Sequence, residues 1–106
     1  MKKLNFTYED KEYTLEFTRR TVAEMERRGF KATEITDKPM SSIPALFEGA
    51  FLAHHKNVKK ETIEEIYDHL GDKEALIAKL AEMYVEPINS LMEEPKEGNV
   101  SWTVAE

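Results

Sequence analysis

Two adjacent histidines, His54 and His55, are the residues whose type first suggests chemistry, because imidazole is a common metal ligand. They end the segment IPALFEGAFLAHHKN, whose apolar spacing predicts a helix. Neighbouring side chains on a helix point about 100° apart, so this pair does not converge on one ion. The third histidine, His69, falls on another predicted element. We therefore expect one inward and one outward histidine, no metal site and no cofactor.

Carboxylates gather in a second segment, KKETIEEIYDHL, at residues 59–70. They lie opposite an apolar stripe, which indicates the solvated face of an amphipathic helix. No histidine at the i+3 spacing of di-iron bundles accompanies them. Their positions are Glu61, Glu64, Glu65 and Asp68. The chain has no cysteine, no glycine-rich phosphate loop and no nucleophile–base pair, so we expect it not to be an enzyme.

The arginines of the protein all fall in one predicted helix, which begins after the N-cap residue Thr18 and stops at Gly29. Glu24 is four residues from two of them, so ion pairs on an exposed helix face are one interpretation. A docking face for an acidic partner is another. A third is nucleic-acid binding by a small regulatory protein of a mobile element. The four residues are Arg19, Arg20, Arg27 and Arg28.

Charge is distributed unevenly along the chain. Residues 1–58 carry 10 Lys/Arg and 9 Asp/Glu, whereas residues 59–106 carry 5 and 12. The second half is therefore strongly acidic and repels phosphate backbones, which makes nucleic acid an unfavourable partner. No apolar run approaches the roughly 18 residues of a membrane helix. The N-terminus also lacks the apolar core of a secretory signal, so we expect a cytoplasmic protein without a membrane partner.

The N-terminal region predicts a β-hairpin that must pack on an apolar surface. LNFTY (4–8) and YTLEF (13–17) each alternate apolar and polar residues, and the polar residues 9–12 separate them. An isolated hairpin is only marginally stable, so its apolar face requires a partner. We expect that partner to be a bundle of helices.

Four helices are predicted to follow: the arginine helix, a central helix over 42–56, a third over 59–70, and a last helix after Asp72. The last one keeps its apolar phase through Pro87, so we expect one kinked helix there and not two elements. Gly49 lies inside the central helix, which indicates close packing at that point. The expected fold is thus α+β, an N-terminal β-hairpin on a bundle of about four helices in a single domain, residues 1–94.

Residues 95–106 form a separate C-terminal tail after the break EEPKEG. Val100, Trp102 and Val104 alternate as in a strand, and Trp102 is the only tryptophan. Three interpretations stay open: a loose end, a third strand on the hairpin, or a strand added to another subunit. We expect residues 99–104 to pair with the hairpin and self-association to strengthen that pairing.

Four segments resemble a known family of small phage and prophage proteins from Gram-positive bacteria. These are KEYTLEFTRRTVAEME, LFEGAFLAHHK, EEIYDHL and MYVEPINSLM, in that order. The sequence is similar to the tail assembly chaperones of long-tailed phages. The resemblance implies a non-catalytic protein of the host cytoplasm that binds the tape-measure protein and helps to recruit tail-tube subunits.

A chaperone for a long helical partner needs exposed apolar surface. Met83 and Tyr84, with other methionines, are candidates for an adaptable surface, although methionines at helical spacing also serve as core filler. The candidate partner-binding residues are Arg19, Arg20, Arg27, Arg28, Met83, Tyr84, Val100, Trp102 and Val104.

Overall fold

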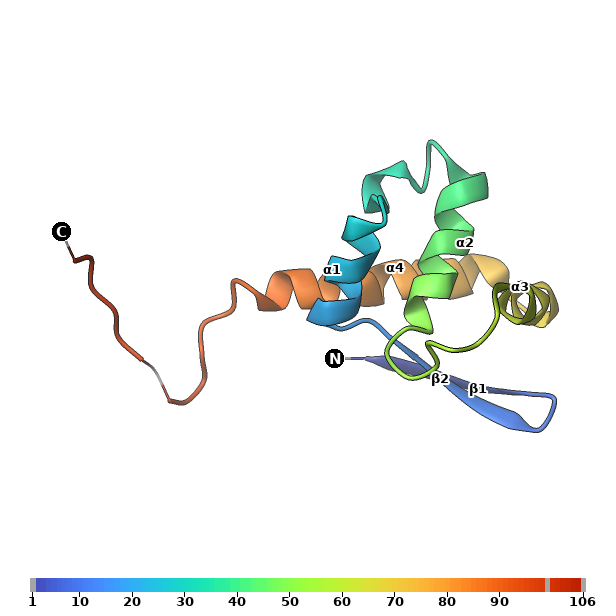
Figure 1. The fold of residues 1–106 in the computed structure, drawn as a ribbon, viewed down its shortest axis with the longest axis horizontal. Coiled ribbons are helices and arrows are strands. Elements are labelled where there is room, and N and C mark those ends of the chain that lie inside the picture. The colour runs from blue at the N-terminus through green and yellow to red at the C-terminus, as the bar shows by residue number, and fades with distance from the viewer. Residues whose placement is uncertain (1, 99, 106) are drawn as a thin grey trace.

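The structure is a computed structural model, and it describes residues 2–98 and 100–105. An antiparallel hairpin is followed by four α-helices, which confirms the α+β fold (Figure 1). The elements are β1 (Lys3–Tyr8), β2 (Lys11–Glu16), α1 (Arg19–Arg27), the 3-10 turn η1 (Ala32–Glu34), α2 (Pro39–Ala50), α3 (Lys60–His69) and α4 (Lys73–Ser90).

The hairpin turn is tighter than the sequence predicts. Only Glu9 and Asp10 separate β1 from β2, instead of the four polar residues 9–12. Both adopt positive φ angles, 49° and 64°, which is the signature of a type I′ turn. This turn matches the right-handed twist of the two strands, and it therefore extends the strand pairing to Tyr8 and Lys11.

Helix α1 begins and ends where its capping residues indicate. The Thr18 hydroxyl accepts a bond from the Thr21 backbone N–H (3.1 Å), and the Thr18 N–H donates to the Thr21 hydroxyl (2.9 Å). This reciprocal pair is a capping box. At the other end Gly29 has a φ of 94°, and Phe30 N–H donates to the Met25 carbonyl (3.0 Å), as in a Schellman motif.

Helix α2 is central, but its predicted bounds, 42–56, are wrong. The helix begins earlier because Pro39 occupies its first turn, where a missing N–H costs nothing. It ends at Ala50, after which Phe51 N–H bonds to the Glu48 carbonyl (3.1 Å) in a tighter turn. Helix α2 contacts α1, α3 and α4, and this position confirms it as the centre of the bundle.

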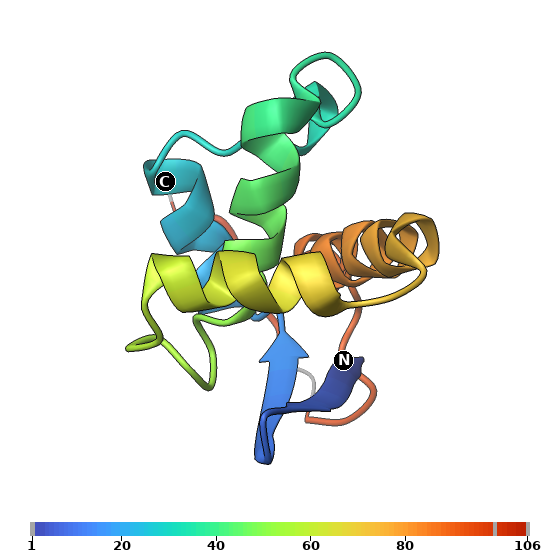
Figure 2. The same cartoon turned by 90° about the vertical axis from the view of Figure 1, so that its right-hand side faces the viewer.

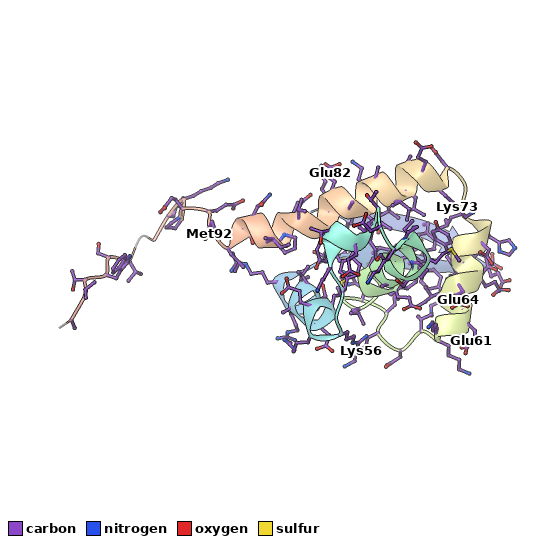
Figure 3. The ribbon with its side chains drawn as sticks, turned by 90° about the horizontal axis from the view of Figure 1, so that it is seen from above. Lys56, Glu61, Glu64, Lys73, Glu82 and Met92 are labelled. Carbon is purple, nitrogen blue, oxygen red and sulfur yellow. The ribbon has the colours of Figure 1, made fainter. Side chains whose placement is uncertain are left out.

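Helix α4 runs through Pro87 as a single element, as its apolar phase predicts. The predicted cap, Asp72, does precede the helix, but its φ of 50° is left-handed and its side chain makes no capping bond. The wet face predicted for α3 is confirmed, because its four carboxylate residues are exposed. Figure 3 shows Glu61 and Glu64 at the end of the molecule opposite to the tail.

The core joins the hairpin to all four helices. Its buried apolar residues are Tyr13, Leu15, Phe17, Val22, Met25, Leu46, Phe47, Ala50, Phe51, Ile63, Ile66, Leu80, Met83 and Tyr84. Phe51 stands at the centre of an aromatic cluster, with ring centroids 5.1 Å from Phe47 and 5.9 Å from Tyr13. Gly49 packs so closely against Met25 that a Cβ at this position would overlap the Met25 sulfur.

The tail leaves the body of the protein beyond α4 (Figure 1). The expected pairing of residues 99–104 with the hairpin is not present in the single chain: residues 100–105 form no strand, and the sheet has two strands among the described residues. Asn99 lies outside the described residues. The tail explains a radius of gyration of 16.3 Å, against about 13 Å for a compact domain of this length. One tail lacks enough partner surface to offset the entropy of ordering it.

Candidate partner-binding surfaces

The C-terminal half of the arginine helix is engaged by its own glutamate. Arg28 Nε lies 3.0 Å from a Glu24 carboxylate oxygen, and Arg27 Nε lies 3.6 Å from the other oxygen. The expected i,i+4 pair between Glu24 and Arg28 is therefore present. The corresponding pair with Arg20 does not form in the described chain. Both pairs are exposed, so they leave the guanidinium groups accessible to solvent.

At the other end of α1, Arg19 ties this helix to the end of α4. Its Nε donates to the Ser90 hydroxyl (2.9 Å), and its Nη2 donates to the Ser90 carbonyl (2.8 Å). An apolar groove of about 270 Å³ lies between the same two helices. It is lined by Arg19, Val22, Ala23, Glu26, Pro87, Ile88 and Leu91. This α1/α4 groove was not predicted from the sequence, because it depends on how two distant helices pack.

Exposed apolar side chains continue from the α1/α4 groove along the end of α4. They are Val85, Ile88, Leu91 and Met92, which we call the α4 stripe. Val85 and Ile88 lie on α4 at the i, i+3 spacing of one helix face, whereas Leu91 and Met92 lie in the turn that follows Ser90. Figure 3 places Met92 where α4 gives way to the tail. The carboxylates of Glu93 and Glu94 follow immediately and are exposed.

Met83 and Tyr84 do not belong to that surface, which corrects the expectation that they bind a partner. Their exposed fractions are 2% and 3%. Tyr84 packs edge-on against Phe17 and Phe30, with centroid distances of 5.4 and 5.2 Å. Burial raises the pKa of the Tyr84 hydroxyl, with a smaller contribution from Glu26. Tyr84 shares a helix face with Ile88, four residues on, so its burial follows from the packing of Phe17 and Phe30 over it and not from helix phase.

A second groove, of about 430 Å³, separates the start of α2 from α3. Met40 borders it with 90% of its surface exposed, so this methionine does lie on the surface. The rim is acidic, with Glu48, Glu64 and Asp68. One carboxylate oxygen of Glu48 is buried and has no hydrogen-bond partner in the described chain. The apolar lining is Pro39, Ile43, Pro44, Phe47, Ile63 and Tyr67.

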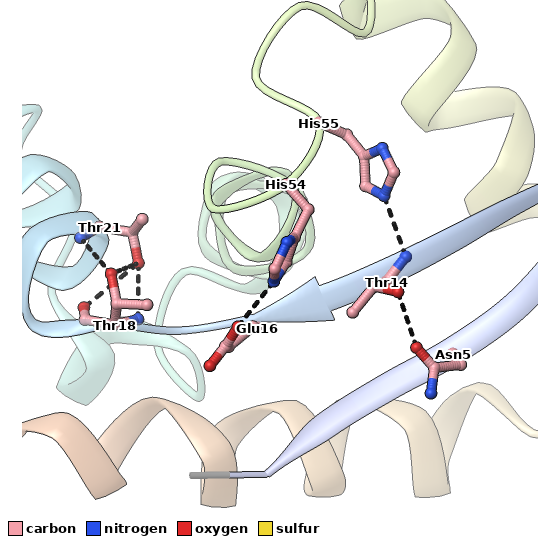
Figure 4. A network of polar contacts seen from close by, with 7 residues as sticks. All are labelled: Asn5, Thr14, Glu16, Thr18, Thr21, His54 and His55. Carbon is pink, nitrogen blue, oxygen red and sulfur yellow. Dashed lines mark hydrogen bonds and ion pairs between the residues drawn. The ribbon is translucent and has the colours of Figure 1, made fainter.

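The two adjacent histidines cover the outer edge of β2 (Figure 4). The backbone N–H of Thr14 donates to His55 Nε2 (3.0 Å), and His54 Nε2 lies 2.7 Å from a Glu16 carboxylate oxygen. His55 is partly buried and His54 is exposed, in agreement with the expected inward and outward placement. The connection between α2 and α3 carries both side chains to the strand.

His55 must be neutral at Nε2 to accept the Thr14 bond. Its pKa is lowered, first by burial and then by the positive charges of Lys11 and His54. Its ring also packs 5.1 Å from the Tyr13 ring. The side chain is thus a structural acceptor that completes the β2 edge.

The tail residues of the predicted partner-binding set are fully on the surface. Val100, Trp102 and Val104 are exposed, Trp102 to 81%. They make no hydrophobic contact with the core cluster. Among residues 2–98 and 100–105, no group of three or more His, Asp or Glu side chains is arranged to hold a metal ion. Within the same residues, no helix has the length and apolar character needed to cross a membrane.

Comparison with known proteins gives one match. A protein-family model described as "Domain of unknown function (DUF5055)" matches residues 1–105. No curated protein and no solved structure matches the chain. Because the match spans nearly the whole sequence, the chain belongs to the DUF5055 family.

Proposed function

We propose that the protein is a non-catalytic tail assembly chaperone of a phage or prophage, acting in the host cytoplasm. Its partner is the tape-measure protein, which it keeps soluble while tail-tube subunits assemble, and the proposal includes self-association of the chaperone. The observation that carries the proposal is the α4 stripe beside the α1/α4 groove. The choice of the tape-measure protein as the partner rests on the four sequence segments that resemble the chaperone family.

The chemistry of this surface fits an amphipathic helix. The α4 stripe presents Ile88 and Leu91 at the mouth of the α1/α4 groove, so an apolar helix face can rest there. Glu93 and Glu94 follow the stripe, and both are exposed. A partner helix with lysine or arginine beside its apolar face would therefore complement this end of α4. Exposed apolar side chains in a chain of net charge −6 also suit a protein that holds an aggregation-prone partner in solution.

Nucleic-acid binding through the arginine helix is the alternative, and the observed contacts weaken its basis. Glu24 pairs with Arg27 and Arg28, and Arg19 bonds to Ser90, so only Arg20 has neither contact among the described residues. A protein that neutralises phosphates loses affinity steeply as salt rises. Elution from heparin at the same low salt as an acidic control protein is the outcome we expect, and salt-dependent retention would favour the alternative.

The test measures, by titration calorimetry, how tightly the protein binds a helical fragment of the tape-measure protein from the same tail module. Ile88→Asp places a charge in the α1/α4 groove, so it should weaken binding about tenfold or more. Met40→Asp is the control, because Met40 is also an exposed apolar residue but lies at the other groove. Its affinity should equal that of the parent.

Two results would count against the proposal in different ways. Equal binding by Ile88→Asp and the parent would remove the α1/α4 groove as the docking surface. Absence of binding to any helical fragment of the tape-measure protein, with the parent folded, would remove the chaperone function itself.

A further inference from the structure

The two edges of the hairpin differ in what covers them. Antiparallel strands alternate between residue pairs that bond to each other and pairs whose backbone groups point outward. Thr14 points its N–H away from β1, because that N–H bonds to His55. Its register partner, Asn5, must therefore point its own N–H outward on the β1 side. The β2 edge is therefore closed by histidines, which leaves β1 as the other edge of the hairpin.

In the part of the chain that the structure describes, the β1 edge has no strand partner from Lys3 to Thr7. Helix α4 flanks only its start, where the Lys2 N–H donates to Glu86 (3.1 Å) and the Lys2 ammonium pairs with Glu82. By the same alternation, Lys3 and Thr7 also point their backbone groups outward. Within the described residues, none of these three amides bonds to a group outside the hairpin. The α2–α3 connection lies on the β2 side, and Figure 2 shows β1 on the opposite side of the hairpin. An unpaired edge of this kind is a template for another strand.

The tail has the properties of the missing strand. Its residues 100–105 are extended and unpaired, and the alternation of Val100, Trp102 and Val104 gives it one apolar face. On β1, Leu4, Phe6 and Tyr8 are only partly buried, so an added strand would continue their apolar face. The apolar pattern of the tail and the unpaired edge of β1 are therefore complementary.

We propose that the tail of one copy adds to the β1 edge of a second copy, with Trp102 packed against the face that carries Phe6. The second copy is the occupant because the tail of the single chain leads away from its own hairpin (Figure 1). In a twofold dimer that exchanges both tails, the second tail binds intramolecularly, so the translational and rotational entropy cost of association is incurred once for two tails. This inference rests on the self-association part of the proposed function and does not depend on the tape-measure protein.

The test uses the purified full chain alone, with sedimentation velocity and Trp102 fluorescence from micromolar to millimolar concentration. The parent should change from monomer to dimer, and its emission should move away from that of free indole in water over the same range. Asn5→Pro removes the outward N–H without touching a bond of the hairpin ladder, so it should weaken the dimer about tenfold or more. Asn5→Ala is the matched control, because it keeps the N–H and should dimerise like the parent.

Trp102→Ala supplies a second variant that cannot unfold the domain, because Trp102 lies outside the core cluster. It should also weaken the dimer about tenfold or more. Emission that is shifted while the chain sediments as a monomer would place the tail on its own chain and overturn the proposal. Emission of free indole at every concentration would show a loose tail and overturn it as well. Because no tape-measure fragment is present, failure here would leave the binding test of the proposed function unaffected.

Discussion

Phe51 and Trp102 are both large aromatic residues, but one is buried and the other is exposed to solvent. Phe51 is 1% exposed at the centre of an aromatic cluster, whereas Trp102 is 81% exposed on an extended tail. Burial of such a side chain stabilises a fold by several kcal/mol. The domain is therefore complete without its most apolar C-terminal residues. The molecule thus has two regions of different character, a folded body that buries Phe51 and a tail that leaves Trp102 in solvent.

The largest expected effect tests the aromatic core of the folded body. Phe51→Ala should lower the free energy of unfolding by about 3–5 kcal/mol, because it leaves a cavity between Phe47 and Tyr13. Urea denaturation followed by circular dichroism measures this loss. A variant as stable as the parent would show that the aromatic cluster is not the core of the fold.

Close packing at Gly49 gives the next effect. A side chain there would overlap Met25, so Gly49→Leu should cost about 1–3 kcal/mol from overpacking. Gly71→Ala is the control, because a Cβ at Gly71 meets no atom within 4 Å. Urea midpoints of the two variants should differ clearly. Equal midpoints would mean that Met25 moves aside freely, contrary to its burial.

The hairpin and the helices of the folded body could be predicted well from the sequence, because local signals agree with tertiary packing there. The capping residues of α1 and the apolar alternation of the strands needed no knowledge of the rest of the chain. The two-residue turn at Glu9 and Asp10 escaped prediction because neither residue is the glycine or asparagine typical of such turns. The start of α2 was misplaced because Pro44 lies inside the helix and Pro39 begins it.

The candidate binding surfaces could be predicted only in part. The alternating tail and the arginine helix are visible in the sequence. The burial of Met83 and Tyr84 is not, because periodicity shows that residues share a face and does not show what covers that face. The α1/α4 groove and the histidine-covered β2 edge join residues far apart in the chain, and no local pattern encodes them.

A smaller effect concerns the closed edge of the hairpin. The pKa of His55 is lowered in the folded protein, so the unfolded chain takes up the proton first as pH falls below about 6.5. The free energy of unfolding should therefore fall between pH 7.5 and pH 5.5. In His55→Gln, which keeps an acceptor but does not titrate, this fall should be weaker. Urea denaturation measures this difference. Identical pH dependence in both proteins would show that protonation of His55 does not lower the free energy of unfolding.

The smallest expected effect concerns the C-terminal tail in the absence of a partner. In dilute solution, Trp102→Ala should change the free energy of unfolding by no more than about 0.5 kcal/mol, because the side chain lies in solvent. The contrast with Phe51→Ala is the direct measure of the difference between the two regions. A loss of about 2 kcal/mol or more in dilute urea denaturation would place Trp102 in the fold of its own chain.

Amide hydrogen exchange by NMR, at low and at high protein concentration, tests most directly that the C-terminal end is held for association. The outward amides of Lys3, Asn5 and Thr7 should exchange fast in dilute protein and gain protection together with residues 100–104 as concentration rises. The amides of Leu4 and Phe6 already bond within the hairpin, so their protection should change little. Fast exchange of the tail and of the three outward amides at every concentration would contradict the account.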